Sequence, residues 1–249
     1  MIVAEIGLNH MGDYETAKEY VNFLIDTEVD AITFQIREQS FYLKSKKSNL
    51  NLNKKVYIEM SKKAAKFQKK FGLALSDMSL IDEVDEYMDF YKILSKDFSY
   101  NFIDHFLRKT DKPLYISTGL NSIESITSVL EKLTDKDKSR ISLIHTQLSN
   151  DVESVNLKSL KFLQKLSCGS VAFGNHCEDY RVCFMSLCYN PSAVFVYVKK
   201  DNQIEYPDNK HAIMLENFGI FCKDIKKLNN AIGSGIKVKM KNIIRGQNE

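Results

Sequence analysis

The hydrophobic pattern divides the chain into short apolar runs that alternate with longer amphipathic segments. Apolar runs typical of strands covered on both faces are expected near residues 2–6, 31–35, 72–76, 90–95, 113–117, 141–145, 170–174 and 193–198. Apolar residues recur at helical spacing near residues 14–27, 55–70, 79–88, 99–109, 121–133, 156–167, 178–188 and 212–231. This alternation of eight strands with eight helices predicts an α/β fold, the (β/α)₈ TIM barrel, whose active site forms from the loops after the strands.

The length of the chain suits one such barrel. A chain of 249 residues, 44% hydrophobic and 27% charged, is large enough to bury a sizeable core. We expect a single TIM-barrel domain over residues 1–249, with the barrel at about 1–235 and a basic C-terminal tail at 236–249. Two long connections, residues 37–53 and 199–211, are candidate substrate-binding loops.

The charge balance and the cysteines narrow the class of protein. With 35 basic and 32 acidic residues, the net charge of +3 gives no reason to expect a nucleic-acid partner. The five cysteines show no CxxC spacing, which indicates reduced thiols in a cytoplasmic protein. The chain starts directly with its first predicted strand, which leaves no room for a signal peptide, and no apolar run approaches the ~20 residues that span a bilayer. We therefore expect a soluble protein without a membrane span.

Polar residues gather where the predicted strands end, which is the catalytic edge of parallel α/β folds. Glu5 lies near the end of an almost unbroken apolar run, and Lys92 lies inside another. In strand order the candidates are Glu5, Asn9 and His10; Gln35 and Arg37; Ser76 and Asp77; Lys92, Ser95 and Asp97; Ser117 and Thr118; His145 and Gln147; Asn175 and His176; and Tyr197 and Lys199. We expect them to form a ring of polar side chains at one end of the barrel.

Several of these residues have two interpretations. Lys92 is either a site residue or a side chain whose ammonium reaches water, because buried lysines are rare unless they are paired or functional. His145 is either a ligand or a core histidine with a satisfied hydrogen bond. His176, at the end of an apolar run, is interpreted as functional. His105 is interpreted as structural, and His211, in a loop, is ambiguous.

A set of collinear motifs resembles the N-acetylneuraminate (sialic acid) synthase family. The segment Ala4-Glu5-Ile6-Gly7-Leu8-Asn9-His10-Met11-Gly12-Asp13 resembles that family's AEIGxNHxGD opening. Further matches, in the same order, are Phe34-Gln35 to KFQ, Tyr91-Lys92-Ile93-Leu94-Ser95 to KIxS, Lys112-Pro113 with Ser117-Thr118-Gly119-Leu120 to KPxxxSTGM, Leu143-Ile144-His145 to LLHC, Val155-Asn156-Leu157 to VNL, Gly174-Asn175-His176 to SDH, and Pro207-Asp208-Asn209-Lys210 to PDHK. The matches span nearly the whole chain, which makes the assignment specific where one motif would not be.

The resemblance implies an enzyme of sialic-acid-type biosynthesis. Such a TIM barrel condenses phosphoenolpyruvate with an N-acetylated amino sugar, giving a nonulosonic acid and phosphate for surface polysaccharide, and uses a divalent cation, Mn²⁺ or Mg²⁺. A homodimer is a further expectation. The site residues expected on this basis are Glu5, Lys92 and Gln35 as catalytic residues, Ser95, Ser117, Asp97 and Asn175 in substrate binding, and His176 as a metal ligand.

The chain departs from the family pattern at several site positions. Thr33 stands where the family has the lysine of KFQ, and Arg37, on the same face of that strand, is a candidate for the missing charge in substrate binding. Tyr197 and Lys199 stand where the family has a glutamate and a second metal-binding histidine. The other changes are Asp97 for Glu, Asn175 for Asp, and Leu148 and Asn150 near the family's Asn and Tyr. The family's C-terminal antifreeze-like domain would begin where this chain ends.

These departures leave three hypotheses. The first is a synthase with an altered pocket that acts on a modified sugar. The second is a catalytically silent homologue that binds a sugar, a phosphorylated metabolite or a partner protein. The third makes Lys92 the Schiff-base lysine of an aldolase, since a desolvated lysine can have a lowered pKa.

Overall fold

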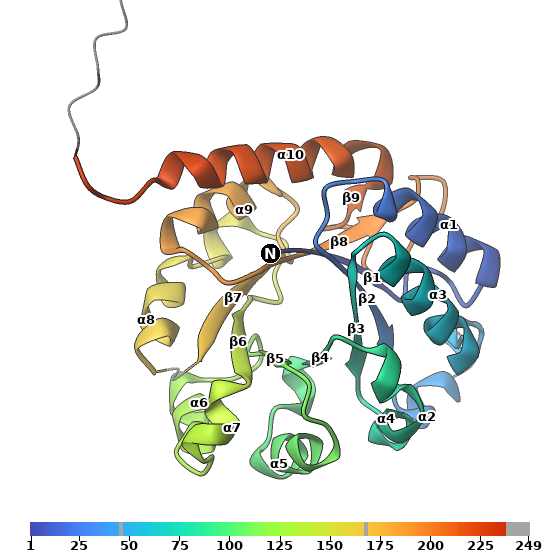
Figure 1. Cartoon of the computed structure of the whole chain (residues 1–249), viewed down its shortest axis with the longest axis horizontal. Helices are drawn as coiled ribbons and strands as arrows, with labels where there is room; N and C mark the ends of the chain where they lie inside the picture. Colours follow the sequence, from blue (N-terminus) through green and yellow to red (C-terminus); the bar gives the residue numbers. More distant parts are fainter. Residues whose placement is uncertain (45–46, 167–168, 238–249) are drawn as a thin grey trace, which may run out of the picture.

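The predicted strands form a closed parallel barrel in the computed structural model, which describes residues 1–44, 47–166 and 169–237. Its strands are β1 (Ile2–Gly7), β2 (Ala31–Ile36), β3 (Lys70–Leu75), β4 (Phe90–Ile93), β5 (Leu114–Ser117), β6 (Ile141–His145), β7 (Ser170–Gly174) and β8 (Val194–Lys199). Each strand pairs in parallel with the next, and β8 pairs with β1, which closes a ring with the helices outside it (Figure 1). The predicted TIM barrel is confirmed.

A helix covers the barrel near each of the eight predicted segments, and most of these helices are shorter than predicted. They are α1 (Tyr14–Ile25), α3 (Lys54–Lys66), α4 (Ile81–Val84), α5 (Tyr100–Lys109), α6 (Ile123–Leu130), α8 (Lys158–Leu166), α9 (Arg181–Ser186) and α10 (Leu215–Ile232). Side-chain caps fix several starts: the carboxylate of Asp13 accepts from the Thr16 N–H (2.6 Å), and Asn53, Ser99 and Ser122 cap α3, α5 and α6.

The predicted helix at 79–88 is broken in the structure. A 3₁₀ turn (Met78–Leu80) precedes the one-turn α4, and a second 3₁₀ turn (Asp85–Tyr87) follows it. Asp82 and Glu86 are four residues apart, so a continuous helix would set like charges side by side. The structure also adds α2 (Gln39–Tyr42), α7 (Asp135–Ser139) and a two-residue strand, β9 (Ile213–Met214), which pairs with β8 where the last helix was predicted to begin.

Two apolar layers stabilise the barrel and set the position of the site. The larger layer lies between the strands and the helices, and the smaller fills the barrel interior with residues that include Val3, Phe90 and Phe195. Two residues further along the same strands are Glu5, Lys92 and Tyr197. Because side chains alternate between the two faces of a strand, these three also point into the barrel, one layer closer to its C-terminal mouth.

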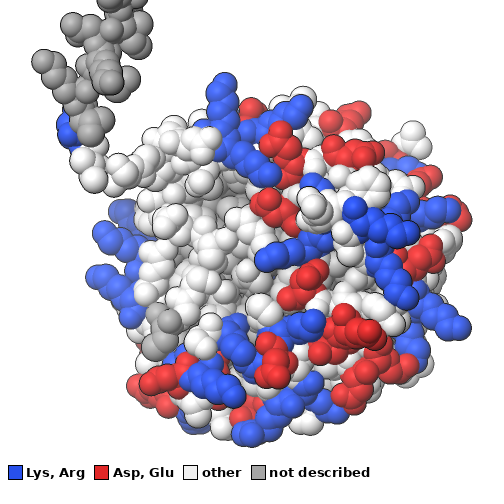
Figure 2. Space-filling model, viewed as in Figure 1, with Lys and Arg blue, Asp and Glu red and all other residues white. Residues whose placement is uncertain are grey.

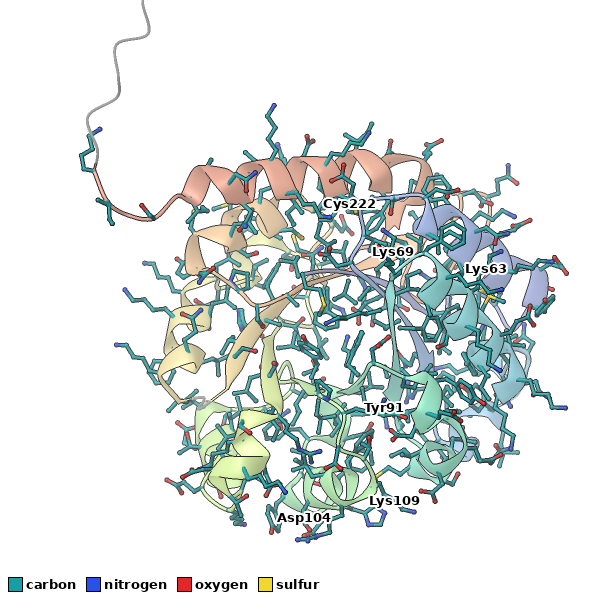
Figure 3. All side chains as sticks on the ribbon, viewed as in Figure 1. Lys63, Lys69, Tyr91, Asp104, Lys109 and Cys222 are labelled. Atoms are coloured by element: carbon teal, nitrogen blue, oxygen red, sulfur yellow. The ribbon has the colours of Figure 1, made fainter. Side chains whose placement is uncertain are left out.

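The surface is charged but of mixed sign. Figure 2 shows Lys and Arg interspersed with Asp and Glu over most of the face in view, with fewer charges around α9. Some charges join neighbouring helices, such as Lys109 of α5 and Asp82 of α4 at 2.8 Å, with Lys109 labelled in Figure 3. Both side chains are well exposed, so this pair contributes at most about 1 kcal/mol.

The remaining sequence predictions concern the termini, the thiols and the membrane. The predicted basic tail lies outside the described residues from residue 238 onward, and so does Cys168. Cys177, Cys183, Cys188 and Cys222 are free thiols, and Cys222 lies on the buried side of α10 (Figure 3). Among the helices that the structure describes, none is long and apolar enough to cross a membrane.

Candidate active site

An ion pair inside the barrel mouth joins β1 to β4. The ammonium of Lys92 donates to the carboxylate of Glu5, and the two side chains are 5% and 4% exposed. The Lys92 nitrogen also lies 5.3 Å from the ring centroid of Phe195 and 5.7 Å from that of Tyr197. The two charges that the sequence placed inside apolar strands thus compensate each other, as buried charges require.

A cluster of rings lies beside this pair. The ring centroids of His176 and His211 are 4.5 Å apart, and Tyr197 lies 5.4 Å from the first and 4.9 Å from the second. Burial and the nearby charge of Lys92 hold the pKa of both imidazoles low, that of His211 at about 4. Burial and the charge of Glu5 raise the pKa of the Tyr197 phenol. All three rings are therefore neutral at neutral pH.

Asp208 adds a second carboxyl group to the mouth. Burial and the negative charge of Glu5 raise its pKa to about 7, against the opposing effect of Lys92. Its Oδ1 lies 3.8 Å from Nε2 of His211. Asn9 fixes this segment: its side-chain oxygen accepts from the Asp208 N–H (3.1 Å), and its amide nitrogen donates to the carbonyl of Val198 (2.9 Å). Asn9 is fully buried, and its bonds join the loop after β1 to β8 and to the loop that follows β8.

The other predicted site residues lie at the ends of neighbouring strands. Gln35, Ser95 and Ser117 are buried at the ends of β2, β4 and β5. Asp97 already has partners, because its carboxylate accepts from the hydroxyl of Ser76 (2.7 Å) and from Lys96 (2.6 Å). These positions bring the polar residues from the first five strands to the same edge, while their roles remain predictions.

Two predicted substrate-binding residues have local partners. The side chain of Asn175 accepts from the N–H of Cys177 (3.2 Å) and donates to its carbonyl (2.9 Å), which fixes the turn after β7. The guanidinium of Arg37 donates to Glu38 (3.1 Å) and lies 4.2 Å from the ring centroid of Phe41. Its charge nevertheless acts to lower the pKa of Asp208, against the larger effects of burial and Glu5. Arg37 therefore contributes positive charge near the mouth.

Three positions that the sequence singled out have structural roles. A ring nitrogen of His145 bonds to the carbonyl of Val155 (2.9 Å), which supports the core interpretation. Nδ1 of His10 accepts from the Gly12 N–H (2.9 Å), which fixes the turn after β1, and burial lowers the pKa of this imidazole to about 4. Lys199 donates to the backbone and side chain of Asn209 (both 3.0 Å) and so fixes the loop after β8.

Sequence reasoning missed two members of the cluster, Asp208 and His211. The PDHK match pointed to Asp208, but no role followed from it, and His211 lies in a loop without periodicity. The hydrogen bonds that bring this loop over the mouth join residues 189 and 199 positions apart in the chain. Such contacts leave no local pattern, so only the folded structure places these side chains.

A divalent cation would find two neighbouring imidazoles here. In the described ranges, no three His, Cys, Asp or Glu side chains are arranged to hold a metal ion. However, Nε2 of His211 is buried without a hydrogen-bond partner there. Two neutral imidazoles fit a cation whose other ligands are water and substrate oxygens, because Mn²⁺ accepts both nitrogen and oxygen donors.

Comparison with known proteins identifies the family. A model described as the NeuB family matches residues 19–237. An uncharacterised protein of Methanocaldococcus jannaschii is 27% identical over 96% of this chain and 74% of its own length, and the N,N'-diacetyllegionaminic acid synthase of Campylobacter jejuni is 23% identical over 95% and 78%. The crystal structure of the N-acetylneuraminic acid synthetase of Leptospira borgpetersenii superposes with a TM-score of 0.86 at 18% identity, over 96% of this chain and 87% of that one. The resemblance found in the sequence is confirmed.

Proposed function

The chain belongs to the NeuB family of phosphoenolpyruvate-condensing synthases, and from that premise we propose that it condenses phosphoenolpyruvate with an N-acetylated amino sugar. The products would be a nonulosonic acid and phosphate, for surface polysaccharide. The observation that carries the proposal is that Lys92 of β4, Glu5 of β1 and His176, just after β7, meet at one mouth of the barrel. We propose further that the barrel, residues 1–235, acts as one domain.

Phosphoenolpyruvate would bind on the side of the mouth formed by β4 and β5. It is a compact polyanion, so it needs cations and hydroxyl donors. Lys92 supplies an ammonium, and Ser95 and Ser117 supply buried hydroxyls at the adjacent strand ends. When phosphoenolpyruvate arrives, Lys92 would share its charge between Glu5 and the ligand, a preorganised arrangement that does not require a new cation to enter the barrel.

The sugar would bind nearer β1, β7 and β8. Carbon 3 of phosphoenolpyruvate attacks the aldehyde carbon. The reaction also consumes one water, and its products are the nonulosonic acid and phosphate. Glu5 would orient the sugar or this water. His176 would help to hold a divalent cation, which when bound would act as a Lewis acid on the aldehyde oxygen. Gln35 would complete the catalytic set.

Polar residues at the rim would set which sugar is accepted. Arg37 and Asp97 follow β2 and β4 at the rim of the mouth, and Asn175 shapes the turn that carries His176. Asp97 stands where the family pattern has Glu, and Asn175 stands where it has Asp. Arg37 has no counterpart in that pattern. We therefore propose that the acceptor sugar is a modified one, rather than the unmodified N-acetylmannosamine.

The test is phosphate release by the purified chain. Phosphoenolpyruvate, Mn²⁺ and a panel of N-acetylated hexosamines are incubated with it, and the sugar product is identified by mass spectrometry. We expect phosphate release with at least one sugar, and its loss in Lys92→Met. The matched control is Lys109→Met, which removes an exposed lysine at the end of α5. Release that persists unchanged in Lys92→Met would contradict the proposed site.

Thr33 favours a second candidate, a silent homologue that binds without turnover. It is buried opposite Glu5 on β2, where the family pattern has a lysine. In that case calorimetry would detect binding of phosphoenolpyruvate or a sugar, but no sugar would give phosphate, even with a separate antifreeze-like protein added. The aldolase hypothesis has less support, because Lys92 is ion-paired, whereas a Schiff-base lysine needs an uncharged amine. Borohydride trapping with pyruvate tests it.

A further inference from the structure

His211 has no counterpart in the motifs that identify the family, yet it lies in the site. Its side chain is only 11% exposed, although it belongs to the connection between β8 and β9. Its ring is tilted by 38° against that of His176, with the centroids 4.5 Å apart. Nε2 of His211 has no hydrogen-bond partner in the described part of the chain, and such a buried nitrogen needs an explanation, which a bound ion supplies.

On β8, the strand position where the family pattern has its second metal-binding histidine supplies no imidazole in this chain. Lys199 occupies that strand position and donates to the backbone and side-chain oxygens of Asn209. This contact fixes the β8–β9 connection from one side, and the Asn9 hydrogen bond to the Asp208 N–H fixes it from the other. The connection is thus anchored at both points before His211, which places that ring against His176.

We propose that His211 replaces the strand histidine and forms, with His176, the imidazole pair of a Mn²⁺ site. This inference rests on the proposed function, because it concerns the cation of the same site. With two nitrogen donors and no complete protein cage among the described residues, the pair favours Mn²⁺ over Mg²⁺, which prefers oxygen ligands. The carboxylate of Glu5, which is paired with Lys92, offsets the positive charge of that ammonium at the same mouth.

Mn²⁺ binding to the full chain tests the proposal without turnover. Free Mn²⁺ is measured by its solution electron paramagnetic resonance signal during titration, and electron spin echo modulation reports imidazole nitrogens on the bound ion. For the wild type we expect two coupled imidazole nitrogens. His211→Ala and His211→Gln should leave one and weaken Mn²⁺ binding about tenfold or more, since even changes to groups that only orient a ligand cost roughly 10–100-fold.

The control is His105→Ala, which removes an exposed histidine on α5 and should leave affinity and spectrum unchanged. Unfolding curves show whether each variant is folded, and His211→Gln keeps a polar side chain if alanine disturbs the loop.

Unchanged affinity and two nitrogens in both folded His211 variants would overturn the proposal, as would a wild type that binds no Mn²⁺. If two nitrogens bind but no sugar releases phosphate, the ligand pair stands and the proposed function fails. If phosphate is released but His211 variants bind Mn²⁺ normally, the function stands and the pair fails.

Discussion

Lys92→Met removes the cation that compensates Glu5 inside the barrel. Both side chains of the pair are almost fully buried, at 5% and 4% exposure. Removing one partner of such a pair leaves a desolvated charge and typically costs about 3–5 kcal/mol. The surrounding layer is aromatic, with Phe195 and Tyr197 on one side of the lysine, so it offers the carboxylate little compensation. We expect the free energy of unfolding to fall by about this amount.

A second substitution separates the lost charge from the lost packing. Glu5→Gln combined with Lys92→Met keeps similar side-chain volumes and removes both charges, so that no unpaired charge is left in the barrel. The double variant should therefore be more stable than Lys92→Met alone by about 2 kcal/mol, because it exchanges a buried unpaired charge for a neutral amide. Lys109→Met, which breaks an exposed pair with Asp82, should cost less than about 1 kcal/mol.

The assay is urea unfolding at pH 7 for the wild type, the two single variants of the pair, the double variant and Lys109→Met. A change in midpoint at constant slope reports stability alone. The reasoning would be refuted if Lys92→Met cost less than about 1 kcal/mol, or if the double variant were no more stable than Lys92→Met. Either result would mean that the two side chains do not compensate each other in the folded protein.

Three further changes test other parts of the structure. Asn9→Ala leaves the buried carbonyl of Val198 on β8 and the N–H of Asp208 in the following loop without these partners, so urea unfolding should show a loss of about 2–4 kcal/mol, together with weaker Mn²⁺ binding. Gly72→Ala would place a Cβ 2.5 Å from the Phe90 ring and should cost about 1–3 kcal/mol, whereas Gly219→Ala, with its nearest atom at 3.8 Å, should not destabilise. His10 has a folded pKa of about 4 against 6.5 unfolded, so its neutral form contributes stability above pH 6.5 that is lost as the pH falls towards 4. The stability difference between the wild type and His10→Asn should shift by about 3 kcal/mol over that range, and parallel pH curves would contradict the assignment.

The barrel could be predicted because its signal is local. Each strand is an apolar run short enough to be recognised alone, and the eight strands lie within a few residues of the predicted ranges. The prediction failed where a local signal was misleading. The segment around α4 has apolar residues at helical spacing, Ile81 and Val84, but only one helical turn forms there, and its acidic residues at the same spacing disfavour a longer helix.

Half of the site was predictable for the same reason. Glu5 and Lys92 are charged residues within apolar strands, and period-two alternation directs them into the barrel together with Tyr197. The positions of Asp208 and His211 had no such basis, because they depend on where a loop crosses the mouth. That path is fixed by Asn9 and Lys199, whose hydrogen bonds to the loop cannot be deduced from spacing.

The positions of Lys199 and His211 are best explained together. A lysine on β8 would bring a third cation towards Lys92 and Arg37 if it pointed into the mouth, and it would oppose a metal ion there. Its ammonium instead holds Asn209, and this contact carries His211 to the place beside His176. Lys199→Ala should therefore weaken Mn²⁺ binding although Lys199 touches no proposed ligand, and Lys199→Gln, which can still donate to Asn209, should restore part of it. If neither variant changed the Mn²⁺ affinity, the loop would be held by Asn9 alone, and the change from histidine to lysine on β8 would have no connection to His211.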